Sequence, residues 1–541
     1  MAAGKAFYFK SILDLLRKVI QNNSFFARTK GSNNNTHSFH SKDEANFHPL
    51  GHTGLSDLTK KNVIFDVEGV LLKSSSMFPY FMLVAFEAGG LLRALALLLL
   101  YPLTWLAGEE MQLKIMVMVC FCGLKRESFK VGRTVLPKFF LEDVGVQGFE
   151  FLMKFRKKVG VSKLPKVMIE EFMTEYLQID FVVGRELKVL HGYYVGLMED
   201  RRKFSPLSSM NHEMLGEPKM ECDFDFIGLG YSKDYLDLYS FCKEIYLTNE
   251  NEKREWQTLP REKYPKPLIF HDGRLAFKPT PVATLAMFMW IPFGVILFIY
   301  RVTVGIYLPY NTHPALMSLS GMKLNLSEPS SFYPSIRITN KDKKESKHVL
   351  YVCNHKTLLD PVFVAACVEP PIKVVTYGIS RISKIISPIR TIGLTREREK
   401  DACTMKKLLS EGGVIVCPEG TTCREPYLLR FSPMFAELSV DEMVPMAIDV
   451  KVSMFYGTTV SGFKGLDPIF LLMNPYLTYS ITRLQKRSEA SNKGKHGDSL
   501  SSSSFRLANE IQGEIGEALG FQCTNLTRKD KYRFLLAGNK E

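Results

Sequence analysis

The chain has no arrangement of cysteines that would hold a metal ion. Its ten cysteines are scattered through 541 residues. Only Cys120 and Cys122 stand close together, and no second pair follows to complete a tetrahedral metal site. Scattered cysteines of this kind are typical of reduced, mostly buried thiols in a protein that faces the cytosol.

Acidic residues are in deficit. The 56 Asp and Glu are outnumbered by 70 Lys and Arg, which leaves a formal charge of +14. A charge of this size favours an anionic partner. The chain lacks zinc-finger, RNA-recognition and helix-turn-helix patterns, so we expect no nucleic-acid partner. Anionic lipid headgroups and phosphorylated small molecules fit better, because apolar segments accompany the charge.

The first 55 residues, a basic segment and linker, contain no apolar run typical of a secretory signal. Residues 6–20 place apolar side chains at helical spacing beside Lys and Arg, as in a mitochondrial presequence or an interfacial helix. The rest of the chain is too long for one ordinary core, so we expect two domains.

Two apolar regions suggest contact with a lipid bilayer. The charge-free end of the first, 94–108, has 15 residues, fewer than the about 20 that a spanning helix needs. The second, 279–300, has 22 uncharged residues and is long enough to span. Both could instead be amphipathic, re-entrant or buried helices. We assign 275–310 to a membrane-associated helical segment.

The C-terminal half has the pattern of an α/β domain. From about residue 345, short apolar strands alternate with helix-like segments, and such domains carry their active groups at strand ends. The expected strands are 349–352, 372–376, 414–417 and 444–448.

The first of these strands leads into His355, and Asp360 follows after four residues. A histidine that acts as a general base needs a carboxylate to fix its tautomer and to stabilise the imidazolium. If a helix starts at residue 355, the two side chains are within reach of each other. A substrate that brings its own hydroxyl makes a Ser or Cys nucleophile unnecessary. Alone, this spacing is also common in surface and capping positions.

Three further blocks follow in order. They are Thr391-Ile-Gly-Leu-Thr-Arg396, Cys417-Pro-Glu-Gly-Thr421 and Met443-Val-Pro-Met-Ala447. Together with the His355 block they resemble the glycerolipid acyltransferases. The longer run from Cys417 to Phe431 resembles the land-plant sn-glycerol-3-phosphate acyltransferases, some of which act in cutin or suberin synthesis. The resemblance covers nearly the whole chain.

This resemblance implies an acyl-CoA-dependent glycerol-3-phosphate acyltransferase over residues 311–541, bound to a bilayer and needing no cofactor. His355 would deprotonate a glycerol hydroxyl, and the resemblance favours the sn-2 hydroxyl. Asp360 would hydrogen-bond the other imidazole nitrogen. The substrate-binding residues carried over by the resemblance are Arg396, Glu419, Gly420, Thr421 and Pro445, with Arg424 and Arg430 as further phosphate candidates. Alternative roles are a charged surface run for Arg396, a plain turn for 419–421 and a strand entry for Pro445. The implied location is the endoplasmic reticulum with the site facing the cytosol, with the mitochondrion as the alternative.

The N-terminal half, 56–255 with an apolar insert at 74–124, resembles the haloacid-dehalogenase-type phosphatases, which have a Rossmann-like sheet. An apolar strand delivers Asp66 and Glu68, where that family has two aspartates. The family's metal-binding aspartates would correspond to Tyr231 and Tyr235, and a phenol is a poor Mg²⁺ ligand. Asp234 and Asp237 lie nearby but out of register.

We therefore expect a degenerate phosphatase domain that binds no Mg²⁺. Two alternatives stay open: a bifunctional enzyme that goes on to release a monoacylglycerol, and a lipid-binding scaffold without catalysis.

Overall fold

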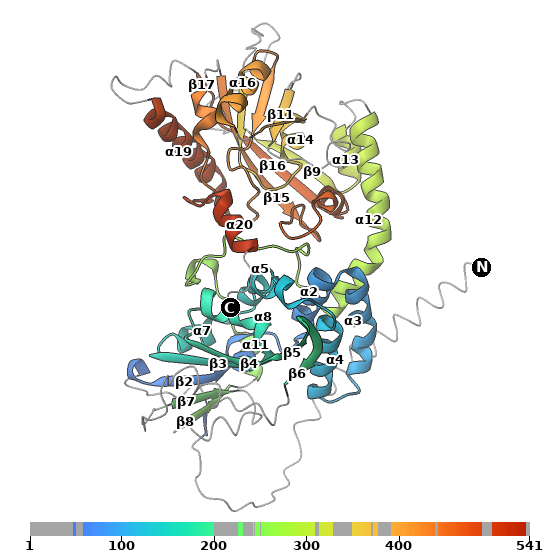
Figure 1. The fold of residues 1–541 in the computed structure, drawn as a ribbon, viewed down its shortest axis with the longest axis vertical. Coiled ribbons are helices and arrows are strands. Elements are labelled where there is room, and N and C mark those ends of the chain that lie inside the picture. Colours follow the sequence, from blue (N-terminus) through green and yellow to red (C-terminus); the bar gives the residue numbers. More distant parts are fainter. Residues whose placement is uncertain are drawn as a thin grey trace, which may run out of the picture. The chain divides into compact units, whose positions relative to one another are not determined.

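The computed structural model describes 47–49, 58–199, 226–230, 242, 244–248, 250–308, 313–327, 349–368, 372–376, 391–395, 397–438, 442–488 and 500–536. The amphipathic segment predicted at 6–20 lies outside the described residues, as do Arg396, Tyr231, Asp234, Tyr235 and Asp237. Figure 1 shows the fold of the described segments.

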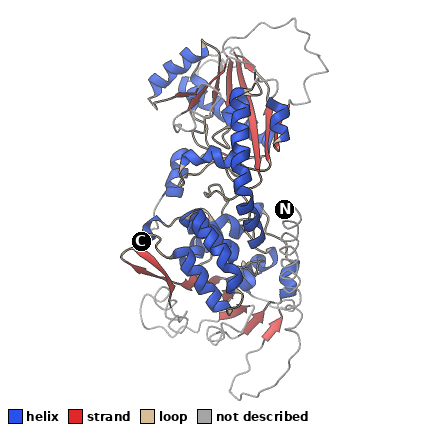
Figure 2. Cartoon of the chain, turned by 90° about the vertical axis from the view of Figure 1, so that its right-hand side faces the viewer, coloured by secondary structure: helices blue, strands red, loops and turns tan. Residues whose placement is uncertain are grey.

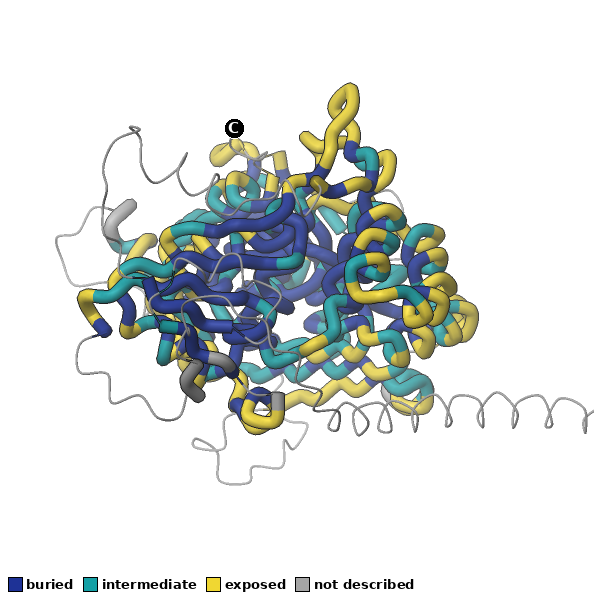
Figure 3. The backbone as a smooth tube through the Cα atoms, turned by 90° about the horizontal axis from the view of Figure 1, so that it is seen from below, coloured by how far each residue is buried: buried dark blue, intermediate teal, exposed yellow. Residues whose placement is uncertain are grey.

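The N-terminal half is built on a six-stranded sheet in the order β1-β8-β7-β2-β3-β4, with every neighbouring pair parallel. Its strands are β1 (Phe47–Pro49), β2 (Asn62–Asp66), β3 (Lys157–Pro165), β4 (Phe181–Arg185), β7 (Phe226–Gly230) and β8 (Glu244–Leu247). Val63, Phe65 and their neighbours are buried because a parallel sheet has both faces covered. The buried strands form the dark blue interior in Figure 3.

Between β2 and β3 the chain folds as helices. The apolar insert at 74–124 forms α2 (Phe78–Gly89), α3 (Leu91–Thr104) and α4 (Glu109–Phe121), and α6 (Leu136–Leu141) and α7 (Val146–Leu152) follow it. Most of α2 is buried, whereas Leu92 and Leu103 of α3 are largely exposed. After β3 come α8 (Lys166–Glu171) and a two-stranded hairpin of β5 (Leu187–Leu190) and β6 (Tyr193–Met198).

The long yellow-green helix of Figure 1 is α12 (Pro281–Tyr307). The Thr280 hydroxyl caps its first turn by accepting from the backbone N–H of Ala283 at 3.3 Å. Its 27 residues have a mean hydropathy of 2.3 in their most apolar window. Only 17% of that window is buried, so α12 is not the core helix of a soluble domain. Among the described residues it is the one helix long and apolar enough to cross a bilayer.

The C-terminal half is built on an eight-stranded mixed sheet in the order β12-β11-β13-β10-β15-β16-β9, with β17 paired to β15. Its strands are β9 (Met322–Ser327), β10 (Val349–Cys353), β11 (Ile372–Thr376), β12 (Thr391–Gly393), β13 (Gly413–Val416), β15 (Glu442–Val452), β16 (Leu477–Arg483) and β17 (Arg487–Ser488). The strand predictions for this half are confirmed, although β15 runs well beyond 444–448. It is longer because β10, β16 and β17 all pair with it.

Helices cover both faces of this sheet, as the blue and red elements of Figure 2 show. Leu350 and Val352 of β10 pack with α16 (Arg398–Leu409) and α19 (Leu500–Leu519). Tyr351 and Cys353 point to the other face, toward α14 (Asp360–Ala365) and α17 (Asp467–Leu472). This two-residue alternation buries both sides of the strand and fixes its register. A last helix, α20 (Arg528–Leu536), ends the described chain.

Candidate active site

The first and third sequence blocks meet because their strands are neighbours. β10 and β13 pair in parallel, with Val352 opposite Val416. Their carboxyl ends therefore lie at the same edge of the sheet, where ligands of α/β domains bind. The loops beyond that edge are joined by backbone as well, since Cys423 N–H donates to the His355 carbonyl at 2.7 Å. The loop that follows β10 and the loop that follows β13 are thus held together, although they are 64 or more residues apart in the sequence.

His355 and Asp360 are hydrogen-bonded, with 3.0 Å between Nδ1 and Oδ2. The contact is made in a turn, and a helix starting at residue 355 is wrong: α14 begins at Asp360. Oδ2 also accepts from the backbone N–H groups of Lys356 at 2.5 Å and Thr357 at 2.8 Å. A carboxylate that binds nearby amides in this way offers the backbone an alternative to helix. The turn places the two side chains face to face.

The electrostatics of this pair favour the charged imidazole. Burial opposes protonation of His355, but hydrogen bonding to the Cys417 sulfur and to the Asp360 carboxylate raises its pKa well above the ordinary value. The Cys417 sulfur lies against Cys353, with 3.4 Å between the two sulfurs. That hydrogen bond and burial raise the pKa of Cys417, which disfavours its thiolate form.

The Glu419 carboxylate links the backbone of the two loops. Oε1 accepts from the backbone N–H of His355 at 2.7 Å, and Oε2 accepts from that of Leu429 at 3.0 Å. The side chain is buried, and burial raises its pKa to about 7. Both carboxylate oxygens are thus hydrogen-bonded to backbone N–H groups, and Glu419 does not line the cavity described next. Its geometry is that of a positioning residue.

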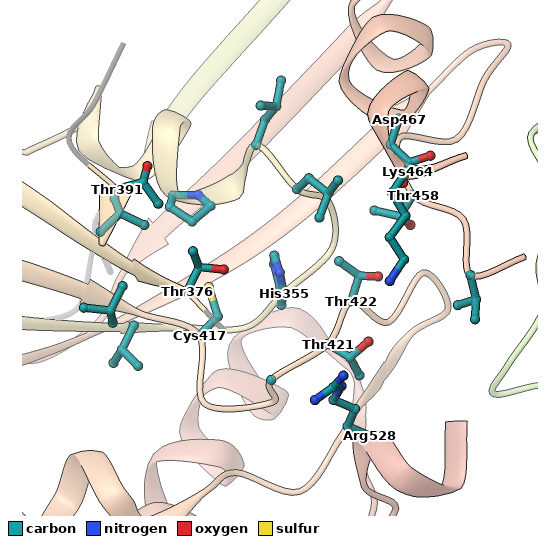
Figure 4. Close-up of a pocket in the computed structure, with 18 of the residues that line it drawn as sticks. His355, Thr376, Thr391, Cys417, Thr421, Thr422, Thr458, Lys464, Asp467 and Arg528 are labelled. Carbon is teal, nitrogen blue, oxygen red and sulfur yellow. The ribbon is translucent and has the colours of Figure 1, made fainter. Parts of the chain in front are cut away.

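A cavity of about 430 Å³ opens at this edge of the sheet, and His355, Gly420 and Thr421 line it (Figure 4). Gly420 has φ +65° and ends a turn in which its N–H donates to the Cys417 carbonyl at 3.1 Å. Glycine adopts this left-handed backbone without strain. Apolar side chains also line the cavity: Leu358, Leu359, Val362, Val374, Val375, Leu394 and Val416.

Three other predicted contacts do not line the cavity. Pro445 is buried in β15 opposite Val352. The Arg424 guanidinium packs over the Tyr456 ring at 4.5 Å, with 3.7 Å between its Nη2 and an oxygen of Asp272. Arg430 is exposed. The predicted site is thus brought together at His355, Asp360, Gly420 and Thr421, with Glu419 in support.

Several lining residues were missed by sequence reasoning. They come from the C-terminal segments: Thr458, Thr459, Lys464, Asp467, Arg528, Lys531 and Tyr532. The cluster Thr-Arg-Lys-Asp-Lys-Tyr at 527–532 is a local signal of charge, but a charged helix is usually a solvated surface. Nothing in the spacing indicates that it folds back more than a hundred residues to reach the turn at Thr421.

The N-terminal half has a second acidic site at the carboxyl end of β2. Asp66 is buried, and one oxygen each of Asp66 and Glu68 lacks a hydrogen-bond partner. Burial and the neighbouring Glu68 raise the pKa of Asp66 to about 8, so a proton shared between the two carboxyl groups would satisfy both. The other Glu68 oxygen accepts from the Ser162 hydroxyl and from the backbone N–H of Lys163 at 3.1 Å.

A lysine lies close to this acidic site. The Lys253 ammonium donates to the backbone carbonyl of Glu68 at 2.6 Å. No group of three or more His, Cys, Asp or Glu with metal-binding geometry exists within the described segments.

The comparisons with known proteins match both halves. Residues 62–248 match the family model of the HAD-like domain of RAM2-like glycerol-3-phosphate acyltransferases, and residues 335–449 match the acyltransferase model. Fold and matches define a two-domain α/β protein in which a haloacid-dehalogenase-like domain precedes a glycerolipid acyltransferase domain, as the sequence predicted.

The relatives identify the family. A probable glycerol-3-phosphate acyltransferase 3 of Arabidopsis thaliana is 51% identical over 491 residues, which cover 90% of this chain and 91% of the relative. The glycerol-3-phosphate acyltransferase RAM2 of Petunia hybrida is 40% identical over 485 residues, covering 87% and 96%. The chain belongs to the plant glycerol-3-phosphate acyltransferase family, and the predicted family is confirmed.

Proposed function

We propose that this enzyme transfers an acyl chain from acyl-CoA to the sn-2 hydroxyl of glycerol 3-phosphate and releases lysophosphatidate. One observation carries the proposal. His355, hydrogen-bonded to Asp360, lines one cavity together with the Gly420–Thr421 turn and a set of apolar side chains. The polar groups suit a phosphorylated polyol, and the apolar side chains suit an acyl chain.

His355 is the general base in this proposal. With Nδ1 held by Asp360, its Nε2 takes the proton of the glycerol hydroxyl. The oxygen attacks the thioester carbonyl, the carbon–sulfur bond breaks, and the CoA thiolate receives the proton from the imidazolium. General-base help of this kind contributes about 10²–10⁴-fold in rate. No acyl intermediate forms on Cys417, whose raised pKa disfavours the thiolate.

The acceptor is held by the second and third blocks. Gly420 and Thr421 contact the polyol directly, since both line the cavity. Glu419 positions the turn through its two backbone hydrogen bonds. Arg396 contributes a planar guanidinium suited to a phosphate. Pro445 does not contact the substrate in this proposal. It lies in β15 opposite Val352 and supports β10, the strand that leads to His355.

The N-terminal half is a structural domain in this proposal and hydrolyses no phosphate. The backbone carbonyl of Glu68 holds the Lys253 ammonium beside the acidic pair. Tyr231 and Tyr235 replace carboxylates that would hold Mg²⁺. We propose that the enzyme uses no metal cofactor.

The enzyme is bound to the endoplasmic reticulum membrane through α12 in this proposal, with the catalytic cavity facing the cytosol. Val282, Phe293 and Ile296 of α12 are each more than 60% exposed, a surface that lipid would cover. Arg301, the helix's one basic side chain, is buried against protein, where it donates to the carbonyls of Leu472 and Asn474. A charged side chain in such a helix is tolerated when it faces protein.

Product analysis tests this function. Labelled glycerol 3-phosphate and oleoyl-CoA, incubated with the purified enzyme and separated by thin-layer chromatography, should give lysophosphatidate. Its phosphate should remain attached with or without added Mg²⁺, because Tyr231 and Tyr235 stand where carboxylates would hold the metal. The Asp66→Asn variant is the matched control and should give the same product in the same amount.

The other outcomes each exclude the proposal in a different way. A monoacylglycerol that appears with Mg²⁺ and disappears in Asp66→Asn would make the enzyme bifunctional. Absence of any acylated product would indicate a lipid-binding scaffold without catalysis. Digestion of the product with a position-specific lipase separates sn-1 from sn-2 acylation.

A further inference from the structure

Cationic side chains gather at one end of the catalytic cavity. Lys464 begins a short 3₁₀ helix, Lys464–Leu466, while Arg528 and Lys531 come from α20. In Figure 4, Lys464 and Arg528 lie with Thr422 to one side of His355, away from Thr376 and Thr391. None of these cations belongs to the four sequence blocks.

The positive charge at this end is not neutralised by the protein. Asp467 is the one acidic residue among the described side chains that line the cavity. Its Oδ1 is already bound by the Arg274 guanidinium at 2.7 Å and the Thr459 hydroxyl at 2.9 Å. Within the described part of the chain, no carboxylate pairs with Lys464 or Arg528. An anion is therefore the ligand that this end favours.

Tyr532 lies against two of these positive charges. Lys464 donates to its hydroxyl at 3.3 Å, and the Arg528 guanidinium stands 4.9 Å from the centre of its ring. Burial would raise the pKa of Tyr532, yet the hydrogen bond and the two positive charges bring it below the ordinary value. Tyr532 is neutral unless deprotonated, so these contacts bring the two cations to one place without cancelling their charge.

Lys531 ties this cluster to the catalytic turn. It is 6% exposed and donates to the Thr422 carbonyl at 2.5 Å, with the Thr421 hydroxyl at 3.4 Å. The start of α20 is itself fixed, because Thr527 donates to Asp530 through its backbone N–H at 2.8 Å and its hydroxyl at 2.6 Å. Arg528 therefore has a defined position relative to the Gly420–Thr421 turn.

We propose that Lys464 and Arg528, with Lys531 behind them, form the subsite that binds the phosphate group of the acceptor. The inference rests on the proposed function and names the part of the site that selects a phosphorylated polyol. Both substrates carry phosphate, but the two differ in reach. The phosphate of glycerol 3-phosphate is a few bonds from its hydroxyls, whereas the pantetheine arm separates the thioester of acyl-CoA from the CoA phosphates. A subsite in the same cavity as His355 suits the former.

Steady-state kinetics of Arg528→Gln, Lys464→Gln and the double variant test the subsite. Each single variant should raise the KM for glycerol 3-phosphate about tenfold or more, as expected for loss of a charge-assisted contact. The KM for acyl-CoA should stay within about twofold in the same proteins, since a contact with one substrate does not weaken the other. Lys529→Gln is the matched control: it removes an equal charge from an exposed position on the same helix. Its KM values should equal those of the wild type.

Unchanged KM values for glycerol 3-phosphate in the double variant would overturn the subsite while leaving acyl transfer by the wild type intact. A rise confined to acyl-CoA would also overturn it and assign the cations to the CoA phosphates. A wild type that acylates nothing would instead contradict the proposed function. Calorimetric titration of glycerol 3-phosphate without acyl-CoA gives a second readout, in which Arg528→Gln should weaken binding by the same factor as its KM rises.

Discussion

Replacing His355 by alanine is expected to lower the rate of acyl transfer at least about 100-fold, the smaller limit of what a positioned general base contributes. The change should not disturb the fold. The contacts that anchor residue 355 to Glu419 and Cys423 use its backbone N–H and carbonyl, which alanine keeps. The measurement is the initial rate of labelled lysophosphatidate formation by the purified variant at saturating substrate.

His191→Asn is the matched control for this variant. His191 is an exposed residue in the turn between β5 and β6, where φ is +50°, a conformation that asparagine tolerates. It should retain wild-type activity. If His355→Ala keeps more than roughly a tenth of the wild-type rate, a general-base role with an effect of about 10²-fold is excluded.

Replacing Asp360 by asparagine is expected to reduce activity by a similar factor, about 100-fold, while keeping the hydrogen bonds of the turn. An amide oxygen in the place of Oδ2 can accept from His355, Lys356 and Thr357 as the carboxylate does. The amide N–H₂ then faces the Thr357 hydroxyl, which can accept. What the substitution removes is the negative charge that stabilises the imidazolium.

The pH dependence of kcat/KM separates this electrostatic role from a structural one. A general base acts in its neutral form, so activity should rise with pH until the raised pKa of His355 is passed. Loss of the Asp360 charge lowers that pKa, so the rising limb of the Asp360→Asn profile should move to lower pH. A limb at the wild-type position, with unchanged thermal unfolding, would show that Asp360 does not act on the imidazole.

The catalytic strands could be predicted from the sequence because their signal is local. Apolar runs of four or five residues bounded by polar turns identify β10, β11 and β13 to within about one residue. Their order in the sheet brings His355 to Gly420, since parallel neighbours end at one edge. The turn at 355–359 was mistaken for a helix because Asp360 binds two backbone N–H groups that a helix would use otherwise.

The cationic end of the cavity could not be predicted in the same way. Lys531 reaches Thr422 across 109 positions of sequence, and no periodicity records such a contact. Glu419 shows the opposite difficulty. A carboxylate beside a glycine turn indicates a ligand contact, yet its two oxygens bind the backbone of His355 and Leu429. Residue type predicts what a side chain can bond to, while only tertiary packing determines its partner.

Rapid-quench measurement of CoA release tests whether the acyl chain passes directly to a hydroxyl that His355 has activated. The enzyme is mixed with oleoyl-CoA, first without and then with glycerol 3-phosphate. Direct transfer predicts no burst of CoA until the acceptor is present, because the acyl chain passes to the acceptor without first binding to an enzyme side chain. A burst of CoA equal to the amount of enzyme, without acceptor, would reveal a covalent acyl-enzyme and exclude direct transfer.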